Sequence, residues 1–286
     1  FTKTTADTAT ATISLPDGNY YWRVRAVDNA NNVGEWQSRN FSISTGPPTN
    51  LTIKINSGAQ FTNSTQVTLT LSASQSTVEM CFSNDNSTWS LWEAFANTKG
   101  MDLSLGDGEK KVYFKCRNLY GNESEVVRDT IILDMTSPTT IDNAPGSWQV
   151  VKPVTVTLTS TDNTSGVAHI YCKFWLIGAT EPDWSEGAEV TITAEGLWYV
   201  KYYSVDAAGN AEINKSKEVW IDTTTPITTD NIPSGWVNTT VTVNLTPSDA
   251  TSGVARTYYK FWVTANAEPS EYIEGTVILV STDGKW

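Results

Sequence analysis

Six aspartates stand at places in the sequence where a divalent cation could be held. They precede two proline-containing segments, follow those segments within a few residues, or lie in turn sequences, and they are Asp134, Asp142, Asp162, Asp206, Asp222 and Asp230. Calcium takes about six to eight oxygen ligands, which aspartate, asparagine and backbone carbonyls supply. Aspartate and asparagine are also ordinary turn residues that accept bonds from their own backbone. Calcium sites at domain junctions and simple turn caps are therefore both open.

Residues for catalysis are few. The chain has one histidine, His169, and we expect it on an outward strand position as a solvated surface residue. A Ser/Cys–His–acid set cannot be assembled here, because it would need a second well-placed base. The sequence shows neither a glycine-rich phosphate loop nor Cys/His spacing for a metal, and carboxylate pairs such as Glu186 and Glu189 have no partner repeated along the chain. We expect no enzymatic activity and no cofactor other than calcium.

Asn-X-Ser/Thr sequences predict N-linked glycans. Nine occur, a modest excess over chance, at Asn40, Asn50, Asn63, Asn86, Asn122, Asn163, Asn214, Asn238 and Asn244. Asn63 and Asn238 lie just before the same strand in two repeats, which is an exposed place for a sugar. Asn122 and Asn163 stand in turns that favour asparagine in any case. We expect several of the nine to carry glycan.

Tryptophan could stack on carbohydrate, but its placement here favours packing. Three pairs recur at nearly equal spacing, and they are Trp148/Trp236, Trp175/Trp262 and Trp198/Trp286. Recurrent placement is what core or interdomain packing produces. We therefore prefer packing to an exposed sugar-binding row for these residues.

The chain repeats itself with a period of about 88 residues, the distance from Trp148 to Trp236. Thr164-Ser-Gly-Val167 returns as Thr251-Ser-Gly-Val254. A weaker copy of the repeat lies upstream, where Val67-Thr-Leu-Thr-Leu71 matches Val154-Thr-Val-Thr-Leu158. A repeat of this length is one self-contained domain rather than a solenoid unit. The chain is thus predicted to be an array of similar modules.

Short segments of alternating apolar and polar residues predict the fold of each module. In the best-defined repeat they are Val154–Ser160, Ala168–Trp175, Glu189–Thr193, Leu197–Val205 and Lys217–Ile221, with Val78–Ser83 and Val112–Arg117 upstream. About seven short strands per repeat without helical periodicity are typical of an antiparallel β-sandwich. The predicted class is all-β.

The cysteines form no disulfide framework. Alternation places Cys81 on the outward face and Cys116 on the inward face of neighbouring strands, and opposite faces cannot be bridged. We expect free thiols, with Cys116 and Cys172 as small core residues.

Composition limits the partners. The 286 residues suffice for two or three domains with full cores, and the net charge is −12 without any basic run. Nucleic acid and anionic membranes are therefore poor partners. No stretch approaches the ~20 apolar residues of a membrane helix, so we expect no membrane insertion in this segment.

Proline-containing segments predict the boundaries, because proline stiffens the chain and favours an extended residue before it. The predicted domains are 1–46, 47–137, 138–225 and 226–286. Residues 1–46 hold only strands expected at the end of a sandwich, and these are Thr10–Ser14, Tyr20–Val27 and Arg39–Ile43. Residues 226–286 hold only strands expected at the beginning of a sandwich. A window cut from a longer chain explains both ends. Completion of one open sandwich by a neighbouring copy is the alternative.

The segment Asp17-Gly-Asn-Tyr-Tyr-Trp-Arg-Val-Arg-Ala-Val-Asp28, followed by Gly34-Glu-Trp36, resembles the end of a bacterial or archaeal fibronectin type III domain. Thr161-Asp-Asn-Thr-Ser-Gly-Val167, Val205-Asp-Ala-Ala-Gly-Asn210 and Ile221-Asp-Thr-Thr-Thr-Pro226 look like hallmarks of prokaryotic immunoglobulin-like domains of large surface proteins. The resemblance implies tandem sandwiches arranged end to end in an extracellular or cell-surface setting. Some adhesins with similar links are stiffened by calcium.

These observations predict a non-catalytic structural component of an extracellular or cell-surface assembly, such as a filament, sheath, surface layer or stalk. Its expected partners are copies of itself, through lateral strand or face contacts. The alternatives are an adhesin stalk that binds cell-surface glycans or host cells, and spacer modules of a secreted carbohydrate-active enzyme. This fold hosts many roles, so it does not decide between them.

Overall fold

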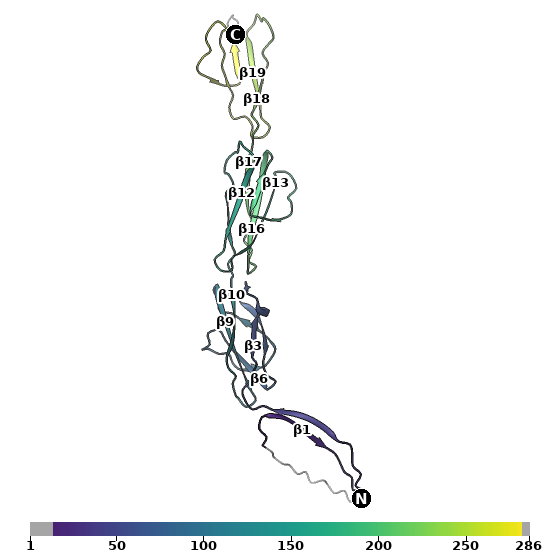
Figure 1. The fold of residues 1–286 in the computed structure, drawn as a ribbon. Helices are drawn as coiled ribbons and strands as arrows, with labels where there is room; N and C mark the ends of the chain where they lie inside the picture. Colours follow the sequence, from purple (N-terminus) through teal and green to yellow (C-terminus); the bar gives the residue numbers. More distant parts are fainter. Residues whose placement is uncertain (1–13, 282–286) are drawn as a thin grey trace. The chain divides into compact units, whose positions relative to one another are not determined.

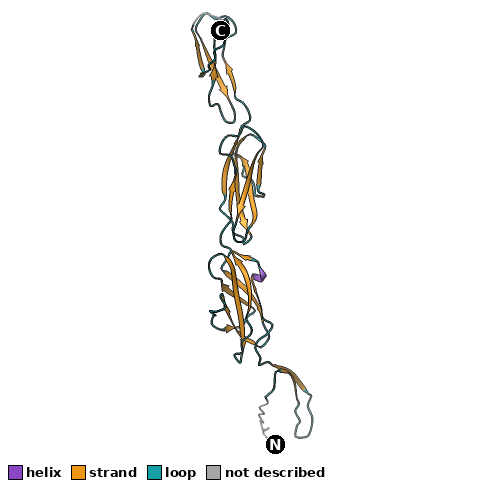
Figure 2. Cartoon of the chain, turned by 60° about the vertical axis from the view of Figure 1, so that its left-hand side comes forward, coloured by secondary structure: helices purple, strands orange, loops and turns teal. Residues whose placement is uncertain are grey.

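The computed structural model describes residues 14–281, and within them the regular structure is almost entirely β-strand (Figure 2). The helical exception there is a single 3-10 turn, η1 (Asn56–Gly58). The chain divides into two compact units, residues 1–136 and 137–286. That division lies one residue from the predicted boundary at 137/138, whereas the boundaries at 46/47 and 225/226 stay predictions.

The first unit begins with a two-stranded antiparallel hairpin, β1 (Gly18–Val24) and β2 (Gln37–Ile43) (Figure 1). Tyr20 stacks on Phe41 across it, with ring centroids 5.5 Å apart. Of the predicted strand Thr10–Ser14, residues 10–13 lie outside the described part of the chain, and Ser14 is not in a strand.

The rest of this unit is a sandwich of two sheets. The smaller sheet has the order β3 (Thr52–Ile55), β5 (Gln66–Ser72), β8 (Thr98–Asp102). The larger has the order β4 (Phe61–Thr62), β10 (Val127–Leu133), β9 (Gly108–Asn118), β6 (Thr77–Ser83), β7 (Glu93–Ala94). All pairs are antiparallel except β4 with β10. Alternate residues of both sheets, such as Leu69 and Phe114, are fully buried between them.

The second unit opens with a sandwich of the same kind. One sheet has the order β11 (Thr139–Asp142), β12 (Val154–Thr161), β15 (Glu189–Ile192). The other has the order β14 (Ser185–Glu186), β13 (Val167–Leu176), β16 (Gly196–Asp206), β17 (Lys215–Ile221). Its core alternates as predicted, with Val156, Val200 and Ile221 fully buried. The five predicted strands of this repeat agree with the observed ones to within two residues at each end.

The remaining strands of the second unit form an open arrangement. They are β18 (Ile227–Asp230), β19 (Val241–Ser248) and β22 (Val277–Val280) in one sheet, and β20 (Tyr258–Tyr259) with β21 (Ile273–Glu274) in another. A hollow of about 720 Å³ lies between them, lined by residues that include Val243 and Ile278. Within residues 14–281, no helix is long and apolar enough to cross a membrane.

The three cysteines are free and buried, as expected. Cys116 and Cys172 belong to the two cores. Cys81 pairs with Lys115 on the outward face of its sheet, as the alternation predicted, yet it is only 1% exposed. Burial raises the pKa of the Cys81 thiol to about 11, and the nearby Lys115 opposes this shift.

Replacement of Ile221 tests whether the core of the second unit is as closely packed as its burial indicates. Ile221→Ala removes a side chain with no solvent exposure and should lower the free energy of unfolding by about 2–5 kcal/mol. Ile213→Ala is the matched control, because Ile213 is 90% exposed and its truncation should change the value by less than about 0.5 kcal/mol. Urea denaturation followed by tryptophan fluorescence measures both, and equal small losses would contradict the packing.

Candidate functional site

An acidic residue followed by glycine recurs where a long strand begins. The three cases are Asp17-Gly18 at β1, Asp107-Gly108 at β9 and Glu195-Gly196 at β16. In each case the carboxylate accepts hydrogen bonds from the chain that leaves the neighbouring antiparallel strand. We call Asp17, Asp107 and Glu195 the linker latches.

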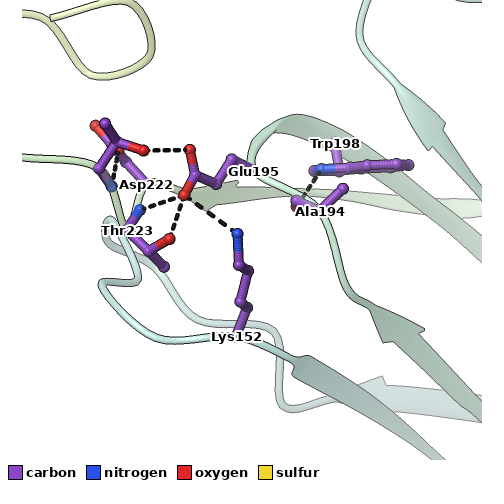
Figure 3. A network of polar contacts seen from close by, with 7 residues as sticks. Lys152, Ala194, Glu195, Trp198, Asp222 and Thr223 are labelled. Atoms are coloured by element: carbon purple, nitrogen blue, oxygen red, sulfur yellow. Dashed lines mark hydrogen bonds and ion pairs between the residues drawn. The ribbon is translucent and has the colours of Figure 1, made fainter.

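Glu195 shows the arrangement most fully (Figure 3). Its Oε1 accepts bonds from the backbone N–H of Thr223 at 3.2 Å and from the Thr223 hydroxyl, and its Oε2 accepts the Thr224 hydroxyl at 2.9 Å. Lys152 Nζ lies 3.3 Å from Oε1. The carboxylate thus satisfies a backbone donor and two hydroxyls just after β17 ends.

Glycine after the acid is required at Glu195. Gly196 has φ +128°, a conformation that L side chains rarely adopt, and a Cβ there would lie 2.5 Å from Leu176 Cδ1. Any other residue at this position would strain the backbone where it enters β16 and would displace the Leu176 side chain.

The first unit holds its linkers in the same way. Asp107 accepts the N–H of Met135 at 2.8 Å and the Thr136 hydroxyl at 2.5 Å. Asp17 accepts the N–H and the hydroxyl of Thr45, both at 2.8 Å. Each latch therefore binds residues about 28 positions further along the chain, directly after the partner strand.

These hydrogen bonds stabilise the ionised carboxylates. The pKa of Glu195 is lowered chiefly by the Thr223 hydroxyl, and that of Asp107 chiefly by the Thr136 hydroxyl. For Asp17 the largest cause of its lowered pKa is the Thr45 N–H. A donor to the charged form favours that form, so all three latches are anionic at neutral pH.

In the first unit the linker that follows β2 also accepts hydrogen bonds from the sandwich. Asn118 is 2% exposed, and its Nδ2 donates to the carbonyls of Thr45 at 3.0 Å and Gly46 at 2.8 Å. Asn122 Nδ2 donates to the Thr45 carbonyl at 2.6 Å. Asn118 is the last residue of β9 and Asn122 lies in the loop that follows, so donors and acceptors of this linker have partners in the hairpin and in the sandwich.

The linker of the second unit has a comparable contact. Asp222 Oδ1 accepts the N–H of Thr224 at 3.0 Å, and its Oδ2 accepts the N–H of Ser252 at 3.0 Å. Asp249 accepts the same Ser252 N–H at 2.9 Å, so the two carboxylates share one donor. The sequence analysis missed Asp249, although Asp249-Ala-Thr-Ser-Gly repeats Asp162-Asn-Thr-Ser-Gly and could have pointed to it.

The predicted calcium ligands all accept bonds from their own neighbourhood. Asp134 accepts the N–H of Thr136 at 3.1 Å, and Asp230 that of Ile232 at 2.9 Å. Asp142 accepts the N–H of Ala144 at 2.9 Å and the Tyr202 hydroxyl. These bonds are the turn caps that the sequence left open as one explanation.

Two of the predicted ligands in the second unit come together. Carboxylate oxygens of Asp162 and Asp206 lie within 4.8 Å of each other. Asp162 also accepts three backbone N–H groups of its turn, and Asp206 accepts the backbone and side-chain N–H groups of Asn210 at 2.8 Å each. Backbone and amide dipoles therefore offset part of the repulsion between the two carboxylates.

The other predicted residues lie on the surface. His169 is on the outward side of β13, with Nδ1 2.7 Å from Glu186 Oε1. All nine sequon asparagines are exposed. Exposure is a condition for glycan attachment and leaves the glycan prediction open.

The recurring tryptophans follow the packing prediction only in part. Trp198 packs against the core of the second unit, and Trp148 lies beside Trp220 with ring centroids 5.8 Å apart. Trp175, however, stands on the outward face of its sheet beside Tyr199, and Trp236 is 88% exposed. Core packing is therefore wrong for these two, because recurrence alone does not say which face a residue occupies. Trp286 lies outside the described residues.

The sequence matches no protein-family model and no curated protein. Solved structures similar to the chain include the fibronectin(III)-like modules of CbhA from Clostridium thermocellum, with 17% identity, TM-score 0.36, and coverage of 59% of this chain and 94% of that one. The FN1–FN3 domains of chicken CNTN1 give 10% identity, TM-score 0.33, and coverage of 70% and 77%. The ligand-binding domain of human OSCAR gives 15% identity, TM-score 0.30, and coverage of 60% and 97%.

Glu195→Gln tests the latch through its pH dependence. Because folding lowers the pKa of Glu195 below its ordinary value of 4.5, its contribution to stability is present above that pH and is lost as pH falls through the folded value. The variant should melt at a lower temperature than the wild type at pH 7, and the difference should shrink toward pH 3. Glu189→Gln, an exposed carboxylate on β15, is the control. Equal melting temperatures of wild type and Glu195→Gln at pH 7 would contradict the latch.

Proposed function

We propose that the chain is a non-catalytic structural part of an extracellular or cell-surface assembly, in which tandem β-sandwich modules are joined by structured linkers. The linker latches carry this proposal. A linker that serves only as a tether leaves its N–H groups and hydroxyls to water, whereas here each latch binds them to the sheet that the linker leaves.

The energetic cost of this arrangement supports a mechanical role. Fixing the backbone of one residue costs roughly 1–2 kcal/mol in conformational entropy. A charge-assisted hydrogen bond offsets that cost better than a neutral one. The same carboxylate-to-linker contact recurs at Asp17, Asp107 and Glu195. A chain whose modules keep a defined spacing needs such contacts at successive linkers.

The strand edges support contacts through faces or ends rather than through added strands. β4, β7 and β14 have only two residues each. The edge strand β17 carries Lys215, Lys217 and Glu218. Short edges and charges hinder strand pairing with another chain. In a filament, sheath or surface layer, copies of the chain would therefore meet through sheet faces.

The non-catalytic part of the proposal rests on the surroundings of His169. It is an exposed residue whose charged neighbour is Glu186, itself exposed. Such a pair is a common surface contact and worth little on its own. An adhesin stalk or a spacer within a secreted enzyme remains the alternative, and both use the same structured linkers.

Distance measurements across the linker 222–226 test the proposal. Spin labels at Thr155 and Thr242, exposed positions on β12 and β19, are introduced as Thr155→Cys and Thr242→Cys after the three native cysteines are replaced by alanine. Pulsed electron paramagnetic resonance should give a narrow distance distribution. Glu195→Ala together with Asp222→Ala should broaden it, and Glu189→Ala should leave it unchanged. A broad distribution in the otherwise unaltered chain would contradict the proposed function.

Calcium at an acidic pair is a further part of the proposal. The Asp162/Asp206 pair places carboxylate oxygens close enough to share a cation. Addition of calcium to chelated protein should raise the melting temperature, and Asp206→Asn should reduce the rise. An unchanged melting temperature would rule out the calcium proposal and would not contradict the linker latches.

A further inference from the structure

We propose that the outward face of the sheet β14-β13-β16-β17 binds a neutral, linear polysaccharide. We call this surface the aromatic face and define it by the outward residues of β13 and β16, which are Tyr171, Lys173, Trp175, Tyr199, Lys201 and Tyr203. Their neighbours in sequence, Cys172, Val200 and Tyr202, are buried in the core, so alternation places the six on the opposite side.

The face is built as three cross-strand pairs. Register places Tyr171 opposite Tyr203 and Trp175 opposite Tyr199, with the pair Lys173 and Lys201 between them. The tyrosine rings stack at 5.1 Å between centroids, and the Trp175 and Tyr199 rings lie 5.5 Å apart. Tyr171 and Trp175, one from each pair, are four positions apart along β13, which corresponds to ~13 Å. Two ring pairs separated along the strands suit a ligand that is long enough to contact both.

The two lysines of the face share one carboxylate. Glu181 lies 2.7 Å from Lys173 and 3.1 Å from Lys201, so one carboxylate bridges two ammonium groups that would otherwise repel each other. Lys173 also lies over the Trp184 ring at 4.2 Å, and Lys201 over the Trp175 ring at 5.1 Å. The three groups carry a net charge of only +1 and are paired with one another, so the face offers hydrogen-bonding groups with a weak field. Such a face matches a neutral polyhydroxylated chain better than a strongly charged polymer.

Aromatic rings with polar edges suit the faces of sugar rings. Tyrosine and tryptophan combine an apolar body with a hydrogen-bonding group, and all four rings of the two pairs are partly exposed. The carboxylate of Glu181 is 41% exposed and the ammonium-bearing side chain of Lys201 is 33% exposed. Apolar sugar faces could therefore rest on the rings while hydroxyls bond to the charged pair between them.

The first unit builds the matching face differently, with the rings of Trp89 and Trp92 beside Lys115 and without cross-strand ring pairs. There Cys81 pairs with Lys115 and Ser83 with Tyr113 at the matching outward positions of β6 and β9. In the following repeat Tyr258, Lys260 and Trp262 stand in the sequence where β13 has Tyr171, Lys173 and Trp175, and there Lys260 and Trp262 line the hollow. The fold accommodates different outward residues at these positions, so the two ring pairs of β13 and β16 are not imposed by the sandwich itself.

Gel retardation of the whole chain by immobilised polysaccharide tests the inference. The neutral probes are hydroxyethylcellulose, laminarin, xylan, galactomannan and amylose, and alginate is the anionic comparator. At least one neutral probe should retard the wild type. Trp175→Ala with Tyr199→Ala should weaken that retardation about tenfold or more, the loss typical of a central aromatic contact. Trp175→Phe keeps a ring and should retain most of the binding.

Tyr113→Ala on β9 of the first unit is the matched control, and its retardation should equal that of the wild type. Circular dichroism and a melting curve establish that each variant is folded. Three results would overturn the inference: no neutral probe retards the wild type, alginate alone does so, or the folded double variant is retarded as strongly as the wild type. The last result would leave the ring pairs as reinforcement of the sheet.

Discussion

A carboxylate that binds the chain leaving its own sandwich is the interaction on which the rest of this structure depends. Antiparallel strands satisfy their own backbone groups, but the residues just past the last strand have no ladder partner. Glu195 supplies acceptors to Thr223 and Thr224 at that point, and Gly196 lets the backbone turn into β16 beside it. The path of the linker is therefore fixed by the sandwich before the next one begins.

The two faces of each larger sheet carry different properties, because the side-chain period of a strand is two residues. Val200 and Tyr202 supply the buried face of β16, while Tyr199 and Lys201 between them face outward. One strand thus contributes to stability through one face and to the proposed binding surface through the other. The linkers lie at strand ends, so mechanical and binding roles occupy separate parts of the module.

The alternation of residues in the sequence predicted the strands of the best-defined repeat to within two residues at each end. It placed Cys116 in the core and Cys81 outward, and both positions are confirmed. It did not predict the burial of Cys81, which depends on side chains from other strands. The latches were missed because each joins residues about 28 positions apart, although the recurring acid–glycine pair at Asp107 and Glu195 was a visible signal. The recurrence of Trp175 as Trp262 indicated that the position is constrained, but it did not indicate which face of the sheet the side chain occupies.

The order of the linker amides tests the central claim most directly. Nitrogen-15 relaxation of the whole chain reports motion on the picosecond-to-nanosecond timescale at Thr45, Met135, Thr223 and Thr224, whose N–H groups take part in the linker contacts described above. If the linkers are structured parts of the sandwiches, their order parameters should match those of the neighbouring strands, about 0.85. Values below about 0.6 at these amides, with ordered strands on either side, would show tethers and contradict the account.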